Sequence, residues 1–166
     1  MAFIVLQVLD NGETIRATQS KQFYIKNKIH RLNGKKYYVV TTKKELIGKI
    51  RENYDCSKIV TTFITDMSYL FCNMTYFNQN INNWDTSNVI NMNSMFYKAK
   101  NFNQNINNWD VSNVKDMSCM FNFAYNFNQP LDMWDVSKVT DLSYMFNEAK
   151  LFNQNINSWD VSKVKF

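Results

Sequence analysis

Hydrophobic positions in the C-terminal two thirds of the chain repeat at a fixed spacing of 25 residues. The recurring markers are a tryptophan followed by aspartate, a Met-Phe pair and a Phe-Asn-Gln triplet. The tryptophans are Trp84, Trp109, Trp134 and Trp159; the pairs begin at Met95, Met120 and Met145, and the triplets at Phe77, Phe102, Phe127 and Phe152. A period of this length indicates an array in which each unit buries its hydrophobic face against its neighbours.

A more divergent unit precedes these repeats. Ile59 stands at the tryptophan position, and Leu70 and Phe71 stand at the Met-Phe position. The array is therefore expected to extend over residues 59–166, as four full coils and a stub that begins at Trp159. Residues 1–58 do not repeat and are expected to form an N-terminal cap.

The hydrophobic pattern changes along each coil. Residues 102–109 contain many asparagines around Ile106, which predicts a short extended segment with Ile106 pointing inward. In residues 114–124 apolar residues recur at steps of three and four, which predicts a short helix capped by Asp116. Stacked coils would place the extended segments about 4.8 Å apart in a parallel sheet. The expected fold class is therefore α+β, with a solenoid of about four coils.

Polar residues that recur in every coil are interpreted as structural. An aspartate follows each tryptophan, whereas an enzyme needs a catalytic carboxylate only once or twice. Stacked carboxylates repel one another unless each accepts local backbone N–H groups, so these aspartates are expected to form turns. The tryptophans are expected in the core, and the triplet asparagines in a ladder that satisfies buried turn backbone. These asparagines are Asn78, Asn103, Asn128 and Asn153.

The first 58 residues predict a β-rich cap that ends in a helix. The strand-like runs are Phe3–Leu9, Gln22–Ile25 and Lys36–Thr41. Hairpin turns are expected at residues 10–12 and 33–34, where Asn-Gly sequences occur. Thr42 and Glu45 have the spacing of a capping box, which predicts a helix that ends near Tyr54. Its apolar side would cover the first coil of the array.

These repeats carry a family resemblance. The unit 109–121, continued by Phe127, Asn128 and Gln129, resembles the BspA-like leucine-rich repeat in the 25-residue variant of mollicute surface lipoproteins and large DNA viruses. The resemblance covers residues 59–166 and implies a leucine-rich-repeat-like solenoid for protein interaction, without catalytic residues. Unlike the surface lipoproteins, the chain shows no export signal, because its apolar start is brief and lacks a basic segment. An intracellular location is therefore expected, in host cytoplasm or in a virion if the protein is viral.

Charge is divided unevenly between the two parts. Residues 1–58 hold twelve Lys and Arg against five Asp and Glu, a net of +7, whereas residues 59–166 hold seven against nine, a net of −2. Basic residues beside aromatics in the hairpin are candidates for binding nucleic acid or another polyanion. The competing interpretation is a solvated lysine-rich surface. The candidate polyanion-binding residues are Lys26, Lys28, Arg31, Lys35 and Lys36.

Composition gives little support for catalysis. His30 is the only histidine, the three cysteines form no CxxC pair, and neither a nucleotide-binding motif nor a metal-ligand spacing occurs. We therefore expect no enzymatic activity, no cofactor and no metal. No segment reaches the length of about 18 apolar residues that a membrane helix needs, so no membrane partner is expected.

The partner-binding surface is expected in the columns that differ between coils, because framework positions must repeat whereas solvent-facing positions are free. Phe123 and Tyr125 stand where other coils mostly carry polar residues, and exposed aromatics are typical interface anchors. The competing interpretation is local packing variation. The candidate partner-binding residues are Lys98, Lys100, Phe123, Tyr125, Glu148 and Lys150.

Three functions remain open from the sequence. The first is a non-enzymatic module that binds another protein. The second is a structural or surface component of a virion or cell envelope, and the third is a polyanion binder. Phe166 stands where other coils carry a polar residue, so three interpretations of this end are open. The stub packs Trp159, Val161 and Val164 on the preceding coil, two copies form an end-to-end homodimer, or the chain continues.

Overall fold

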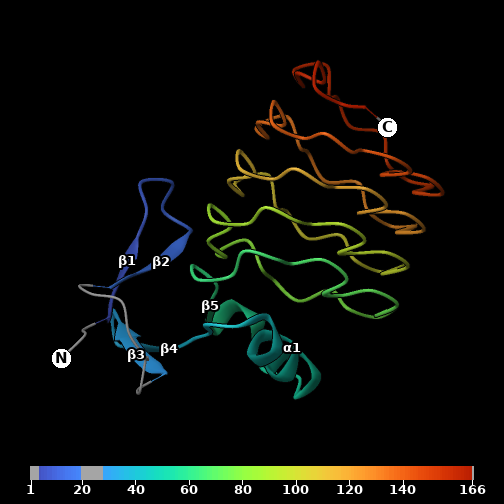
Figure 1. The fold of residues 1–166 in the computed structure, drawn as a ribbon. Helices are drawn as coiled ribbons and strands as arrows, with labels where there is room; N and C mark the ends of the chain where they lie inside the picture. The colour runs from blue at the N-terminus through green and yellow to red at the C-terminus, as the bar shows by residue number, and fades with distance from the viewer. Residues whose placement is uncertain (1–3, 20–27, 166) are drawn as a thin grey trace.

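The computed structural model describes residues 4–19 and 28–165 (Figure 1). Two small sheets precede the repeats. In the first, β1 (Ile4–Val8) pairs antiparallel with β2 (Ile15–Gln19). In the second, β3 (Ile29–Leu32) pairs antiparallel with β4 (Lys35–Val39), and β4 pairs parallel with the two-residue strand β5 (Ile59–Val60). Both sheets lie beside the start of the repeat region (Figure 1).

Both predicted hairpin turns are confirmed. Gly12 lies between β1 and β2, and Asn33 and Gly34 link β3 to β4; all three residues have positive φ angles, which these turns require. The position of β2 was not predicted, because its sequence Ile-Arg-Ala-Thr-Gln contains only one large apolar residue. The predicted strand Gln22–Ile25 lies outside the described residues.

The helix α1 (Lys43–Arg51) begins where the sequence predicts and ends three residues before Tyr54. The Thr42 hydroxyl accepts a hydrogen bond from the Glu45 backbone N–H at 3.2 Å. The Glu45 carboxylate accepts from the backbone N–H of Thr41 at 2.9 Å, one residue earlier than in a standard capping box. After α1, a single 3-10 turn η1 (Cys56–Lys58) leads into β5.

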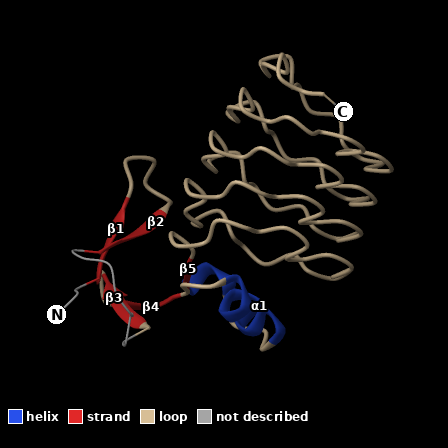
Figure 2. Cartoon of the chain, viewed as in Figure 1, coloured by secondary structure: helices blue, strands red, loops and turns tan. Residues whose placement is uncertain are grey.

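Residues 61–165 contain neither a helix nor a strand, and they form successive coils that lie one upon another above α1 (Figures 1 and 2). The short helix expected in residues 114–124 is a chain of turns, and the extended segment expected in residues 102–109 pairs with no strand. The parallel pairing that does occur is limited to single-residue bridges elsewhere in the coil. The bridges run through Asp66, Asn91, Asp116 and Asp141.

Alternating backbone conformation explains this difference. Cys119 and Phe123 have φ angles of 56° and 59°, and the equivalent residues of the other coils are also left-handed, which interrupts a right-handed helix. Alternate N–H groups therefore point to the next coil rather than back along the chain. The N–H of Asn73 donates to the Tyr97 carbonyl at 2.8 Å. This carbonyl shares its peptide group with the N–H of Lys98, which in turn donates to the Asn122 carbonyl at 2.8 Å.

Four such columns of peptide groups run through the coils with the same polarity. Their N–H groups begin in the first coil at Met67, Tyr69, Phe71 and Asn73. Such alignment resembles the peptide alignment of an α-helix, so in these four columns the first coil presents carbonyl groups and the last coil presents N–H groups. Two other columns have the opposite polarity, and they begin where the N–H groups of Ile90 and Asn101 donate back to the Thr65 and Thr75 carbonyls. Helix α1 covers the first coil, and the Lys43 ammonium lies 3.0 Å from the Asp66 carboxylate and 2.7 Å from the Ser68 hydroxyl.

The repeated aromatic residues form continuous columns in the core. Trp109 is 2% exposed, which confirms its predicted burial, and its indole N–H donates to the Ile81 carbonyl at 3.1 Å. Its ring lies parallel to that of Trp84, with centroids 6.4 Å apart. Two phenylalanine columns lie beside the tryptophans, and Phe96 stacks on Phe102 of the other column at 3.9 Å.

The repeated aspartates form turns and the repeated asparagines form a ladder, as the sequence predicts, but the predicted burial of the ladder is wrong. Asp110 accepts hydrogen bonds from the backbone N–H and the hydroxyl of Ser112, two residues later, and so closes a turn. The Asn103 backbone N–H donates to the Asn78 side chain at 2.9 Å, and the Asn103 side chain accepts from Asn128 at 3.0 Å. This asparagine ladder lies on the surface rather than around buried turns.

Candidate interaction surface

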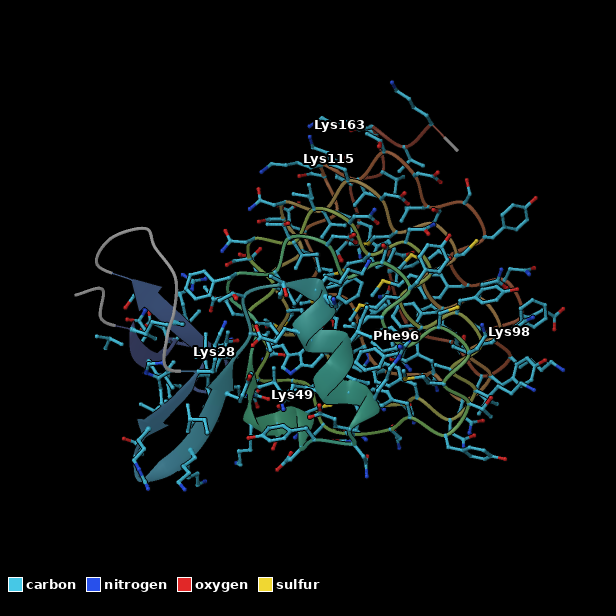
Figure 3. All side chains as sticks on the ribbon, turned by 60° about the horizontal axis from the view of Figure 1, so that its bottom comes forward. Lys28, Lys49, Phe96, Lys98, Lys115 and Lys163 are labelled. Carbon is cyan, nitrogen blue, oxygen red and sulfur yellow. The ribbon has the colours of Figure 1, made fainter. Side chains whose placement is uncertain are left out.

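The variable columns converge on one cluster at the outside of the coils. Figure 3 shows Lys98 at the outer edge of the molecule, away from Lys28 beside the N-terminal strands, whereas Phe96 lies inside. Six side chains make up this aromatic–lysine cluster, which spans three successive coils. They are Tyr97, Lys98, Lys100, Phe123, Tyr125 and Lys150.

Cation–π contacts connect the cluster. The ammonium groups of Lys100 and Lys150 lie 5.4 and 4.8 Å from the centroid of the Tyr125 ring. The Lys98 ammonium lies 5.1 Å from Tyr97 and 5.7 Å from Phe123. The Phe123 ring contacts both tyrosines edge to face, with centroids 6.2 Å from each. All these distances fall within the usual range of aromatic and cation–π contacts.

The cluster remains accessible. Phe123 and Tyr125 are half-buried, and Lys100 and Lys150 are exposed. Burial of both aromatic rings would have ruled out a binding role, and neither ring is buried. Glu148, the sixth candidate from the sequence, is exposed and follows Lys98 and Phe123 in the same column, with a positive φ of 56°.

Tyr97 is the member of the cluster that sequence reasoning missed. A signal for it exists, since Tyr97 stands where the next two coils carry Asn122 and Asn147. Comparison of this one further column would have added Tyr97 to the candidates.

The carboxylates of the repeats are mostly engaged in turns. Asp66, Asp116 and Asp141 each accept a backbone N–H from the residue two positions later, as Asp110 does. Backbone and hydroxyl hydrogen bonds from Ser137 lower the pKa of Asp135 in the same way. Most negative charge of the coils therefore belongs to the repeated framework, whereas the variable columns of the cluster carry lysines together with Glu148.

The predicted polyanion site is less coherent. Lys26 lies outside the described residues. Lys28 is engaged by the Glu45 carboxylate at 3.2 Å and the Thr41 hydroxyl at 2.7 Å. Although burial raises the pKa of Glu45, hydrogen bonds from Thr41, Lys28 and Tyr38 lower it below its usual value. This candidate basic surface therefore includes one lysine that already has an internal counterion.

The other three hairpin candidates lie close together at the end of β3 and β4. Arg31 pairs directly across from Lys36, and Leu32 pairs with Lys35. Like charges directly opposite each other destabilise an antiparallel pair. Arg31, Lys35 and Lys36 are exposed, and Arg31 donates to the Gly34 carbonyl at 3.2 Å.

A partly buried ion pair that the sequence did not predict joins the N-terminal strands to the coils. Arg16 of β2 donates to the Asp85 carboxylate, which is also bonded to Thr62 and Ser87. Burial raises the pKa of Asp85, but the hydrogen bonds from these partners outweigh it and hold that pKa below its usual value. Arg16 and Asp85 lie 69 positions apart in the sequence, and no local pattern links them.

The three cysteines differ in burial, and the described part of the chain holds no candidate metal site. Cys56 is buried, and its desolvation raises the pKa of the thiol to about 12, whereas Cys72 and Cys119 are half-buried. Across residues 4–19 and 28–165, no group of three His, Cys, Asp or Glu side chains could hold a metal ion. None of the helices in this part of the chain is long and apolar enough to cross a membrane.

A second surface feature is a shallow groove of about 490 Å³ between the end of α1 and the first coil. Its lining contains no charged side chain, and Tyr76 on its rim is 87% exposed. Amide side chains form much of its wall, including those of Asn53, Asn73 and Gln79. The groove lies outside the aromatic–lysine cluster and shares no residue with it.

The core of the coils extends into α1. Leu46 and Ile50 of this helix belong to the same buried cluster as the tryptophan and phenylalanine columns, whereas Leu6, Ile15 and Val39 form a second, smaller core beneath the strands. The helix and the coils therefore form one packed unit that begins near Val40, although Val60 of β5 packs in the smaller core.

Comparison with known proteins gives the same boundary. Residues 41–137 and 106–166 match the model of a family described as Mycoplasma protein of unknown function, DUF285. Together the two matches span residues 41–166, so the chain belongs to this family. The first match begins just before the Thr42 cap of α1. No curated protein and no solved structure matches the chain.

Proposed function

We propose that residues 41–166 form a leucine-rich-repeat-like solenoid of the BspA-like type, and that this solenoid binds another protein through the aromatic–lysine cluster. The observation that carries the proposal is the position of Tyr125 between Lys100 and Lys150. All three residues stand at a position that differs from coil to coil, so packing of the coils does not require them. Their side chains nevertheless contact one another through cation–π interactions.

The framework beneath the cluster supports a binding role. Main-chain hydrogen bonds between coils and the stacked aromatic columns fix the backbone on which the cluster is mounted. Half-buried aromatic rings on a fixed backbone lose little conformational entropy when a partner binds. Tyrosine and other large aromatics are also the residues that dominate binding energy in protein interfaces.

Site-specific cross-linking tests the proposal. A photo-reactive amino acid would replace Lys100 in one variant and Lys163 in a control, because Figure 3 shows Lys163 on a different surface from Lys98. We expect a discrete protein cross-linked from position 100, competed by unlabelled wild type, and lost when Tyr125→Ala is added. Equal cross-linking from both positions, or none from position 100, would contradict the proposed function.

A further inference from the structure

We infer that the partner of the aromatic–lysine cluster is an acidic polypeptide segment that lies along the stack of coils. This inference rests on the proposed function and specifies the chemistry of its partner. It follows from the unpaired lysine charges of the cluster, from the placement of these lysines along the stack of coils, and from the aromatic rings that lie between them.

Unbalanced positive charge is the first argument. Lys98, Lys100 and Lys150 form no ion pair with any residue of the described ranges, and their ammonium groups lie over aromatic rings instead. An ammonium group has three donors, and a ring face satisfies it only in part. The free N–H groups can therefore donate to carboxylates of a partner without the loss of an internal counterion.

The arrangement of the lysines gives the direction of the partner. Lys98 and Lys100 come from one coil, and Lys150 comes from the second coil after it, with Tyr125 of the intervening coil between them. A segment that follows the axis of the coils contacts all three lysines, whereas a segment that follows a single coil reaches at most two. The Phe123 and Tyr125 rings supply an apolar floor for this path.

Glu148 favours a polypeptide over a nucleic acid. Its exposed carboxylate stands in the same column as Lys98 and Phe123. A phosphate backbone carries negative charge at every nucleotide and would be repelled by this carboxylate, and nucleic-acid affinity grows with the number of phosphates that Lys and Arg neutralise. A polypeptide can place a neutral or basic residue opposite Glu148 and acidic residues on either side.

Fluorescence anisotropy with defined probes tests this inference. The probe is a labelled peptide of about ten residues, enough to cross three coils, rich in glutamate and containing one tyrosine. A peptide with glutamine in place of glutamate and a single-stranded oligonucleotide of matched length are the comparison ligands. At about 50 mM salt we expect the glutamate peptide to bind at least about tenfold more tightly than either comparison ligand.

Two triple variants with equal loss of charge separate the cluster from general electrostatics. Lys98→Ala with Lys100→Ala and Lys150→Ala should weaken peptide binding about tenfold or more. Lys115→Ala with Lys138→Ala and Lys163→Ala removes three exposed lysines elsewhere and should change binding by less than about twofold. Circular dichroism and thermal unfolding would verify that both variants are folded.

Several results would overturn the inference. Equal weakening by both triple variants would show that only net charge matters, and tighter binding of the oligonucleotide would assign the surface to nucleic acid. A cross-linked protein partner whose contact segment is not acidic, and whose affinity does not fall with salt, would refute the acidic partner but leave the proposed function intact. Absence of any specific cross-link from position 100 would instead refute the proposed function.

Discussion

The Arg16 guanidinium donates two hydrogen bonds to the Asp85 carboxylate, at 2.9 and 3.2 Å, and so joins the β1–β2 hairpin to the coils. Asp85 is 2% exposed, whereas Asp110 and Asp135 at the same position of the next two coils are exposed. One member of a repeated column of turn-forming aspartates has therefore become the attachment point for the N-terminal strands.

This ion pair predicts a specific pH dependence of stability. The pKa of Asp85 is lower in the folded chain than its usual value of 3.8, so its stabilising contribution is present above that value and is lost as the pH falls through the folded pKa. Urea unfolding at neutral pH and near pH 3 should show a smaller loss of stability for Asp85→Asn than for the wild type. The wild type and the variant share all other aspartates. An equal loss of stability at low pH in both proteins would therefore show that Asp85 does not contribute to the pH dependence.

Removal of the cation should destabilise the fold. Arg16→Ala leaves the Asp85 carboxylate buried without its charged partner, and we expect the free energy of unfolding to fall by about 3 kcal/mol. Asp110→Asn is the matched control, because Asp110 is exposed and bonds only within its own turn. Chemical denaturation should place that control within about 1 kcal/mol of the wild type.

The tryptophan column should dominate stability within the coils. Trp109→Ala removes a buried ring and leaves the Ile81 carbonyl without its donor, so we expect a loss of about 3–5 kcal/mol. Tyr76→Ala removes an aromatic side chain that is 87% exposed and should change stability by less than about 0.5 kcal/mol. A Trp109→Ala protein that melts at the wild-type temperature would refute the role of the column.

The framework of the coils could largely be predicted, because each coil repeats the same physical requirement. Trp109, Asp110 and Asn103 recur at a spacing of 25, and recurrence within one chain separates residues needed by every coil from those that are free. The same comparison located Phe123 and Tyr125 on the surface.

The path of the backbone between these residues could not be predicted in the same way. A spacing of three and four residues is shared by a helix and by the chain of turns that residues 117–123 form, and the left-handed conformations at Cys119 and Phe123 involve residues that do not favour them. The Arg16–Asp85 pair was missed because the two residues are brought together only by the tertiary fold. No periodic pattern in the sequence links them.

Left-handed backbone at the variable columns makes a further prediction. Glu148 has a φ angle of 56°, a conformation that costs most residues about 1 kcal/mol and costs glycine almost nothing. Glu148→Gly should therefore be more stable than Glu148→Ala by about 1 kcal/mol in chemical denaturation. Lys150 has no positive φ angle, so the order should be reversed there, with Lys150→Ala the more stable variant. Identical orders at both positions would argue against the alternating backbone.

The polarity of the peptide columns bears on self-association. The N–H groups of Tyr144, Phe146 and Glu148 continue three of the columns, and they donate no hydrogen bond to any described residue. About a two-fold axis that passes through this row of peptide groups, the donors of one copy would face the identical donors of the other, so this row could not pair with itself. A dimer about such an axis would depend on side-chain contacts from residues such as Val161, which is 50% exposed, whereas Trp159 of the stub packs on Trp134 of the preceding coil as predicted.

We therefore expect the 166-residue chain to sediment as a monomer at about 100 μM, since apolar contact alone at one small end falls short of a stable interface. Analytical ultracentrifugation of the wild type and of Val161→Asp should give the same sedimentation coefficient. Leu151→Asp, at a second exposed apolar position, is an independent check on the same surface. A wild-type dimer that either substitution dissociates would show that side-chain contacts overcome the opposed N–H groups, and would establish the end-to-end homodimer.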